Sequence, residues 1–165
     1  MPAAVFRRLF AIDKAATLYN SAIGPKAQKC PMHVSGCDDS SSLLPISSLQ
    51  EELFPGTSEV HTVEVRVAPL NSFLRKEDIA RPALLKLDVQ GFELEALQGC
   101  ESLLSEFDWI YSECSFVELY SGQKLAADLI EWLSNRGFRL IEMYNPLHDR
   151  HGQSIQADFL FRCAT

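Results

Sequence analysis

Strand-like and helix-like patterns alternate through the second half of this 165-residue chain. An apolar run that follows a proline predicts a buried strand over residues 83–87, and apolar residues then recur at helical spacing over residues 93–104. Residues 109–114 return to strand composition. A second helix and strand follow over residues 125–136 and 138–144. Such alternation predicts an α/β fold with a mostly parallel sheet that helices cover on both faces.

The other segments are shorter and are separated by glycine, proline and serine residues. In chain order they are an amphipathic stretch over residues 3–14, a strand over 17–23, an extended piece over 32–34, a polar loop over 35–42, a strand over 59–67, a short helix and linker over 69–80, a polar loop over 145–153 and a closing strand over 156–162. The closing strand returns after a hairpin-like loop, so we expect it to be antiparallel. Because a chain of this length buries roughly 70% of its unfolded surface, we expect one domain over residues 1–165.

Charge and hydropathy argue against several kinds of partner. The chain has 22 acidic and 15 basic residues and a net charge of −7, which disfavours binding to nucleic acid or to an anionic membrane surface. No apolar run approaches the roughly 18 residues of a membrane span. Arg7 and Arg8 interrupt the N-terminal apolar stretch that could serve as a secretion signal, and the first 24 residues contain too few serines for a typical mitochondrial transit peptide. We therefore expect a cytoplasmic protein.

The cysteine and histidine residues do not form a metal-binding pattern. Cys30, His33 and Cys37 could supply three zinc ligands, but no second Cys/His pair at ligand spacing follows them, so a loop with reduced thiols is the preferred interpretation. His148 and His151 flank another polar loop that has no further ligand at a defined spacing. The five cysteines are odd in number and mostly far apart, which disfavours a disulfide framework. We predict no metal site.

Two acids stand at the ends of neighbouring predicted strands. Asp88 follows the strand over residues 83–87, with Gly91 and Glu93 at the start of the next helix, and Glu113 lies at the end of the following strand. In an open α/β sheet, ligands bind outside the carboxyl ends of the strands, so Asp88 and Glu113 are expected in one crevice, where one carboxylate is suited to general-base work. The alternatives are structural: Asp88 caps the helix, Glu93 stabilises the helix end, and Glu113 is solvated.

A larger set of residues makes a known family recognisable. Residues 84–93 combine an apolar strand with an acid, a glutamine, a glycine and a helix start, and Leu97, Gly99 and Cys100 follow. Further matching positions are Ser21, Ala22, Ile23, Gly24, residues 40–44, Ser112, Glu113, Glu118, Leu119, Tyr120, Gly122, Gln123, Leu133, Gly137, Phe138 and residues 157–161. On these residues the chain resembles the FkbM family of S-adenosylmethionine-dependent methyltransferases.

The resemblance implies a class I methyltransferase fold, which is Rossmann-like, and S-adenosylmethionine as cofactor. The residues implied in cofactor binding are Ala22, Ile23, Gly24, Asp88, Gln90 and Gly91. Glu93 and Tyr120 would face the acceptor, which the resemblance implies to be a hydroxyl on a small molecule or a sugar. A carboxylate can align such a hydroxyl and take its proton, and Asp88 is the first choice for this role, with Glu113 next.

Parts of the family pattern are missing from this sequence. Pro25 and Asn71 stand where the family usually carries acids, which puts in doubt any role of those acids in ordering the cofactor side. The glycine-rich turn implied for the cofactor, together with the first two strands, has no counterpart, because Gly24 and Gly36 are isolated glycines. We therefore expect an N-terminally truncated domain in which the strand over residues 83–87 has an unpaired edge.

Three functional hypotheses remain open. The first is O-methyl transfer to a small molecule or a sugar. The second is a non-catalytic remnant that acts by pairing with itself or with another chain along the exposed strand edge, and the missing glycine-rich turn motivates it. The third is an unrelated α/β ligand-binding domain.

Overall fold

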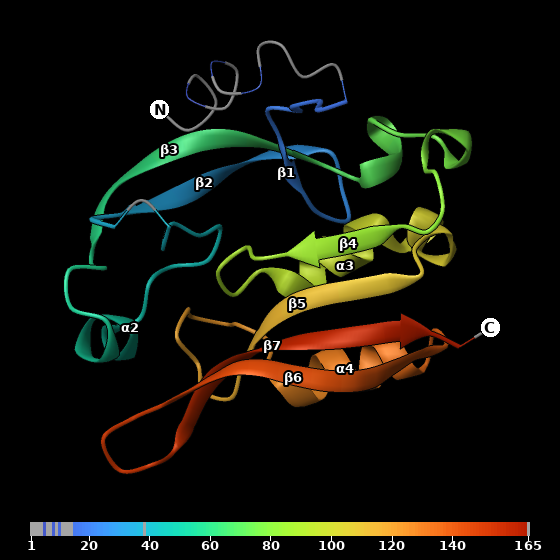
Figure 1. Ribbon diagram of the computed structural model, residues 1–165. Coiled ribbons are helices and arrows are strands. Elements are labelled where there is room, and N and C mark those ends of the chain that lie inside the picture. Colours follow the sequence, from blue (N-terminus) through green and yellow to red (C-terminus); the bar gives the residue numbers. More distant parts are fainter. Residues whose placement is uncertain (1–4, 6–7, 9, 11–14, 38, 165) are drawn as a thin grey trace.

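The computed structural model describes residues 5, 8, 10, 15–37 and 39–164, and their strands form two separate sheets (Figure 1). The amphipathic stretch expected over residues 3–14 lies largely outside the described residues. No helix among the described residues is long and apolar enough to cross a membrane.

The larger sheet has four strands in the order β4 (Leu84–Leu87), β5 (Trp109–Ser115), β7 (Ser154–Cys163) and β6 (Phe138–His148). β4 and β5 are parallel, and β7 is antiparallel to both β5 and β6. The prediction of an antiparallel closing strand is therefore confirmed. β6 continues to His148, so the polar loop expected to start at residue 145 is shorter than predicted.

The smaller sheet has three strands in the order β1 (Ala22–Ile23), β3 (Glu59–Ala68) and β2 (Gln28–Ser35). β1 is parallel to β3, whereas β2 and β3 form a long antiparallel pair. The prediction of one mostly parallel sheet is wrong, because only two of the five pairings between described strands are parallel. The apolar and polar residues that alternate along β3 are typical of an antiparallel strand with one face in solvent.

Two helices cover one face of the larger sheet. α3 (Glu93–Cys100) continues into the 3₁₀ helix η3 (Glu101–Glu106), and α4 (Ala126–Ser134) follows β5. Both helices lie behind the sheet in Figure 1 and pack on its buried apolar side chains. This core includes Leu97, Leu129, Leu133, Ile110, Phe159 and Phe161. The expectation that helices flank both faces is wrong for α3 and α4, which share one face.

α3 also contacts the smaller sheet. A Cβ atom added at Gly99 of α3 would lie 2.7 Å from the backbone C and O atoms of Gly24, just after β1. This distance is shorter than real Cβ contacts, so the close approach of helix and strand requires glycine at residue 99. Among the described strands, β1 and β4 each stand at an end of their sheet and pair with a single neighbour.

Short helical segments complete the described chain. α2 (Ser48–Leu53) was not expected from the sequence, and it begins where the Ser47 side chain accepts a hydrogen bond from the Gln50 amide at 3.3 Å. The 3₁₀ helices η1 (Leu70–Ser72) and η2 (Lys76–Asp78) replace the single short helix expected over residues 69–80. α2 lies beside the carboxyl end of β5 and packs on a second apolar cluster that includes Leu119 and Ile155.

Candidate functional site

The turn after β4 places the first acids of the site. Gln90 and Gly91 both have positive φ angles, 54° and 93°. A Cβ atom at Gly91 would lie 2.9 Å from the Tyr120 side chain, so this turn requires a glycine. Glu93 Oε1 accepts hydrogen bonds from the backbone amides of Val89, at 3.2 Å, and Gly91, at 3.1 Å. Glu93 therefore fixes the turn from the first residue of α3.

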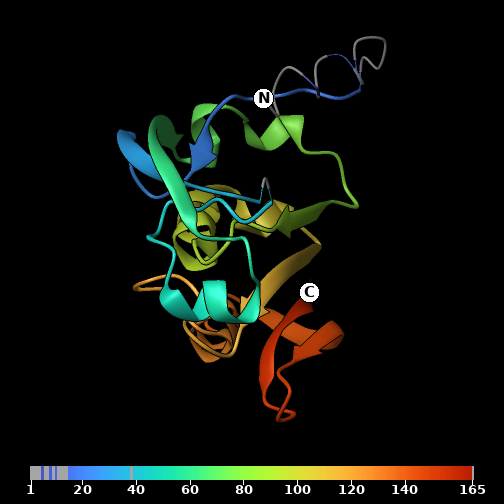
Figure 2. The same cartoon turned by 90° about the vertical axis from the view of Figure 1, so that its left-hand side faces the viewer.

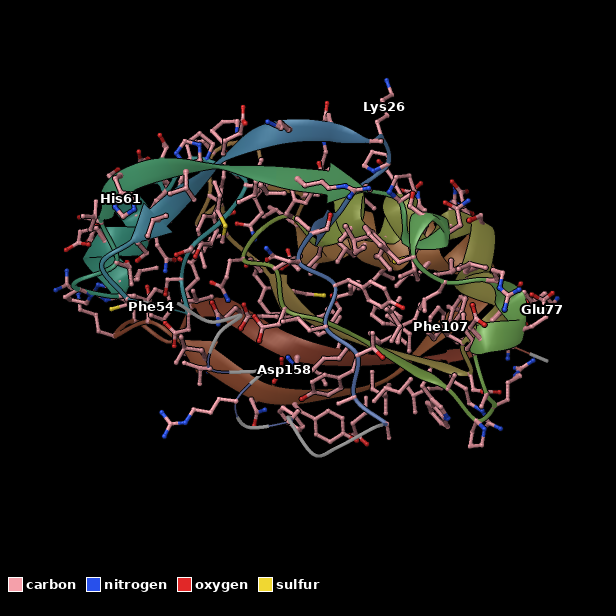
Figure 3. All side chains as sticks on the ribbon, turned by 90° about the horizontal axis from the view of Figure 1, so that it is seen from above. Lys26, Phe54, His61, Glu77, Phe107 and Asp158 are labelled. Atoms are coloured by element: carbon pink, nitrogen blue, oxygen red, sulfur yellow. The ribbon has the colours of Figure 1, made fainter. Side chains whose placement is uncertain are left out.

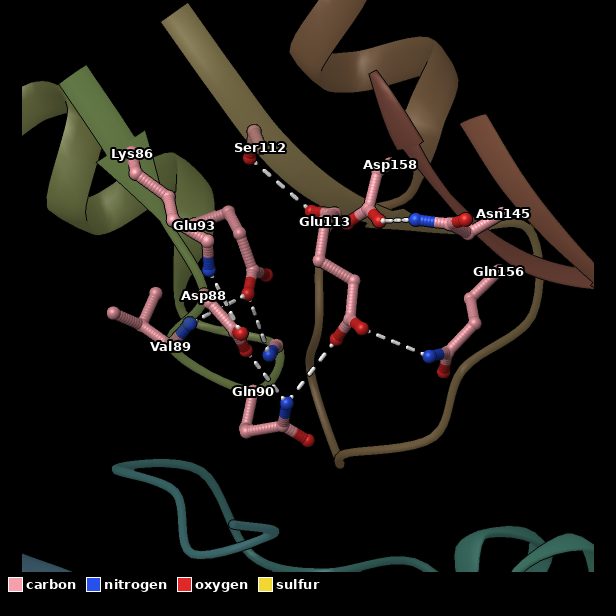
Figure 4. A network of polar contacts seen from close by, with 11 residues as sticks. Lys86, Asp88, Val89, Gln90, Glu93, Ser112, Glu113, Asn145, Gln156 and Asp158 are labelled. Carbon is pink, nitrogen blue, oxygen red and sulfur yellow. Dashed lines mark hydrogen bonds and ion pairs between the residues drawn. The ribbon is translucent and has the colours of Figure 1, made fainter. Parts of the chain in front are cut away.

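Gln90 joins Asp88, which follows β4, to Glu113, which lies near the carboxyl end of β5 (Figure 4). Its Nε2 donates to Asp88 Oδ1 at 2.9 Å and to Glu113 Oε2 at 3.1 Å. Its Oε1 accepts a hydrogen bond from the Tyr120 hydroxyl at 2.7 Å, and its backbone oxygen accepts one from Ser42 Oγ at 2.6 Å. The prediction that Asp88 and Glu113 meet in one crevice is confirmed as geometry, and Gln90 is the group that holds them together.

The environment favours the protonated forms of two of these acids. Burial, together with the smaller effects of the charges of Asp88, Glu93 and Asp158, raises the pKa of Glu113 from 4.5 to about 7. Burial also raises the pKa of Glu93 to about 7, despite the backbone amides that donate to it. Glu113 Oε1 in addition accepts a hydrogen bond from Gln156 Nε2 at 2.9 Å. Near neutral pH, small changes in this cluster shift its proton occupancy.

The structure separates the roles left open for these acids. Asp88 does not cap α3, because Phe92 occupies the N-cap position and makes no side-chain capping bond. Asp88 instead forms an ion pair with Lys86, with Nζ and Oδ2 3.0 Å apart, and both side chains are about half exposed. Glu93 does bind backbone amides at the helix start, as the structural alternative predicts. Glu113 is not a solvated strand end, since two glutamine amides donate to its carboxylate.

A polar cavity of about 240 Å³ lies at this edge of the sheet. Its lining includes Asp39, Gln50, Phe54, Asp88, Glu113 and Gln156. Gln50 is only 4% exposed, and its Oε1 atom has no hydrogen-bond partner among the described residues. Sequence analysis did not single out Gln50 or Phe54, although a serine three residues before a glutamine, as in Ser47 and Gln50, is a signature of a helix start.

The remaining predicted site residues lie elsewhere. Ala22, Ile23 and Gly24 do not line the polar cavity. A Cβ atom at Gly24 would lie 2.7 Å from Val67 Cγ1, so this segment packs closely against β3. Tyr120 is 1% exposed, and its hydroxyl donates a hydrogen bond to Gln90 from the core. Tyr120 therefore positions Gln90 and does not itself face an acceptor.

Comparison with known proteins bears on this arrangement. A family model described as a methyltransferase FkbM domain matches residues 4–140, which is most of the chain. The match includes the turn after β4 together with Asp88, Glu93 and Glu113. The chain belongs to the FkbM methyltransferase family. The match ends within β6, so β7 of this FkbM domain lies beyond it. No curated protein and no solved structure matches the chain.

FkbM proteins are S-adenosylmethionine-dependent methyltransferases, so the fit of that cofactor to this FkbM domain can be tested. No two glycines of the sequence are closer than eight positions, and the closest pair, Gly91 and Gly99, lies in the β4–α3 turn and within α3. The segment around Gly24 is packed against Val67 and α3. The polar cavity is smaller than the roughly 300–1,000 Å³ of typical small-molecule sites. The described residues therefore do not complete a site for S-adenosylmethionine.

Metal-binding interpretations of the FkbM domain find no geometric support. Among the described residues, no group of three or more His, Cys, Asp or Glu side chains is placed to hold a metal ion. His33 Nδ1 lies 2.7 Å from Glu59 Oε2, and Cys37 Sγ donates to the backbone oxygen of Gly56 at 3.4 Å. Asp149 accepts hydrogen bonds from the backbone amide of His151, which stabilises the β6–β7 turn.

Proposed function

We propose that this chain forms the acceptor side of an S-adenosylmethionine-dependent O-methyltransferase that acts on a hydroxyl of a small molecule or a sugar. The observation that carries the proposal is the pair of carboxylates, Asp88 and Glu113, which Gln90 brings into one cavity. The unpartnered Oε1 of Gln50 adds another hydrogen-bond acceptor, which suits a ligand with several hydroxyl donors. Phe54 offers an apolar surface for the carbon skeleton of such a ligand.

The chemistry assigned to the chain's own residues is proton removal. A hydroxyl oxygen that accepts a methyl group must lose its proton, and a carboxylate within hydrogen-bond reach can take it. S-adenosylmethionine supplies the activated methyl group when it is bound. We prefer Glu113 as the base, because its pKa of about 7 lies near neutral pH and two amides hold its carboxylate in place. The proposal thus places Glu113 before Asp88, which the sequence made the first choice, because Asp88 forms an ion pair with Lys86.

The proposal places the part of the site that binds S-adenosylmethionine, the methyl donor, outside the described residues. The described residues do not complete a cofactor site, and β1 and β4 each have one unpaired edge. Further strands could pair with these edges and bring a glycine-rich turn close to Asp88. The proposal therefore requires that a rearrangement of this chain or a partner subunit completes the binding site for S-adenosylmethionine in solution.

Calorimetric titration with S-adenosylhomocysteine, the product formed with every acceptor, tests the proposal. We expect binding in the micromolar range, about −8 kcal/mol. Transfer of a labelled methyl group to a panel of hydroxyl acceptors should then fall on the order of 100-fold in Glu113→Gln, the contribution typical of a general base. Glu142→Gln, which changes an exposed acid on β6, serves as the matched control and should retain full activity. Absence of binding by a folded sample would refute methyl transfer by this chain.

A second candidate function is protein pairing along β4. Within the described part of the chain β4 pairs with β5 alone, and Leu84 is 57% exposed at this edge. Free backbone amides and carbonyls on an edge strand can pair with another chain, including a second copy. Sedimentation analysis should then show a dimer that Leu84→Lys weakens. A monomer at all concentrations would exclude self-pairing.

A further inference from the structure

A second and larger cavity adjoins the polar one. It has a volume of about 640 Å³, within the range typical of small-molecule sites. Its apolar lining comes from Leu49 and Leu53 of α2, Val117 after β5 and Ile155 of β7. The other side of the cavity is polar, because Glu52 of α2 and His148, Asp149, Arg150, His151 and Gln153 at the β6–β7 turn also line it. Figure 1 shows this turn and α2 at the same side of the molecule. We call this space the apolar cavity.

The two cavities have one lining residue in common. Phe54, which follows α2 and is labelled in Figure 3, lines both of them. Along β7, Ile155 lines the apolar cavity, and the next residue, Gln156, lines the polar cavity. α2 likewise contributes Leu53 to the apolar cavity and Gln50 to the polar one. Phe54 is therefore the lining residue that the two cavities have in common.

The unpartnered atom of Gln50 indicates which part of a ligand belongs in the polar cavity. Gln50 is 4% exposed, and its Oε1 lacks a hydrogen-bond donor among the described residues. Buried polar atoms are normally paired, so a donor group of a ligand is the natural partner for this oxygen. Asp88 and Glu113 line the same cavity and also accept hydrogen bonds. The polar cavity thus suits hydroxyl groups, and the apolar cavity suits a hydrocarbon portion.

We infer that the acceptor is amphipathic, with a hydroxyl-bearing end in the polar cavity and an apolar chain or ring in the apolar cavity. This inference rests on the proposed function and names its substrate class. Phe54 lies at the junction between the two parts of the ligand. The hydroxyl that donates to Gln50 Oε1 lies in the same cavity as Glu113.

Two glucosides with the same sugar and different tails test the inference. Octyl β-D-glucoside, used below its critical micelle concentration, and methyl β-D-glucoside are titrated into the full chain by calorimetry. We expect the octyl compound to bind at least tenfold more tightly, because burial of its additional CH₂ groups is favourable. Gln50→Met, which removes the amide but keeps a similar volume, should weaken both compounds at least tenfold.

Matched variants on β6 distinguish cavity binding from adsorption. Leu147 lines the apolar cavity, whereas Leu140 does not, and both are 40% exposed. Leu147→Glu should remove the advantage of the octyl compound, and Leu140→Glu should preserve it. Equal affinity of the two glucosides, an equal effect of the two variants, or no binding of either glucoside would overturn the inference. Binding of S-adenosylhomocysteine in the same sample would show that the proposed function survives such a result.

Discussion

Replacement of Glu113 by glutamine is predicted to stabilise the folded chain at high pH and to have little effect at low pH. Because burial and neighbouring acids raise its pKa from 4.5 to about 7, the folded state binds a proton that the unfolded state releases. The resulting stabilisation is complete below about pH 4.5 and is lost as the pH rises through about 7. At about 1.4 kcal/mol per pH unit, the full difference is about 3 kcal/mol.

Glutamine removes this titration but has one acceptor oxygen instead of two. Glu113 accepts hydrogen bonds from Gln90 and Gln156, so the variant loses one of them, which costs about 1 kcal/mol. The variant should therefore be more stable than the parent by about 2 kcal/mol at pH 8.5 and equal to it within about 1 kcal/mol at pH 5.

Urea denaturation followed by tryptophan fluorescence at both pH values measures these free energies of unfolding. Glu142→Gln, at an exposed position on β6, should change the free energy by less than about 0.5 kcal/mol at either pH. A stability difference for Glu113→Gln that is the same at pH 5 and pH 8.5 would refute the reasoning, as would a less stable variant at pH 8.5.

Three further predictions concern packing and reactivity. Gly99→Ala should lower the free energy of unfolding by about 1–3 kcal/mol, because the added methyl meets the backbone of Gly24, and an unchanged urea midpoint would contradict this contact. Tyr120→Phe should destabilise the fold by about 1 kcal/mol and shift the NMR signal of the glutamine amide that its hydroxyl contacts; an unmoved signal would disprove that contact. Burial raises the pKa of Cys100 and Cys114 to about 12, so neither should react with a thiol reagent until urea unfolds the chain. The thiols expected to react in the folded state are those of Cys30, Cys37 and Cys163, and reaction of a fourth would count against the structure.

The second half of the fold could be predicted because its periodicity is strong. The strands β4, β5 and β7 and the helices α3 and α4 lie close to their expected ranges. The first half could not be assembled from the sequence, because local alternation predicts a strand but not its partner. The antiparallel pairing of β2 with β3 depends on contacts between residues far apart in the chain.

The candidate site was predictable in part for a related reason. Asp88 stands directly after one apolar strand and Glu113 near the carboxyl end of the next, and the topology of an α/β sheet brings such positions together. Gln50 lies in the short helix α2 and Phe54 directly follows it, well before Asp88 and Glu113 in the chain, and only tertiary packing places them in the same cavity. The link through Gln90 depends on a side-chain conformation that no sequence pattern specifies.

α3 connects the smaller sheet to Glu93 and to the turn after β4. The eight residues of this helix form a rigid rod about 12 Å long. Glu93 stands at its first residue and holds the turn, while Gly99 near its other end rests on the backbone of Gly24. A displacement of the smaller sheet would shift the C-terminal end of α3 at Gly99 and, with it, the carboxylate of Glu93 at the N-terminal end of the helix. Substitutions in β1 or β3, which contribute no residue to the lining of either cavity, should therefore alter the protonation of Glu93 by displacing α3.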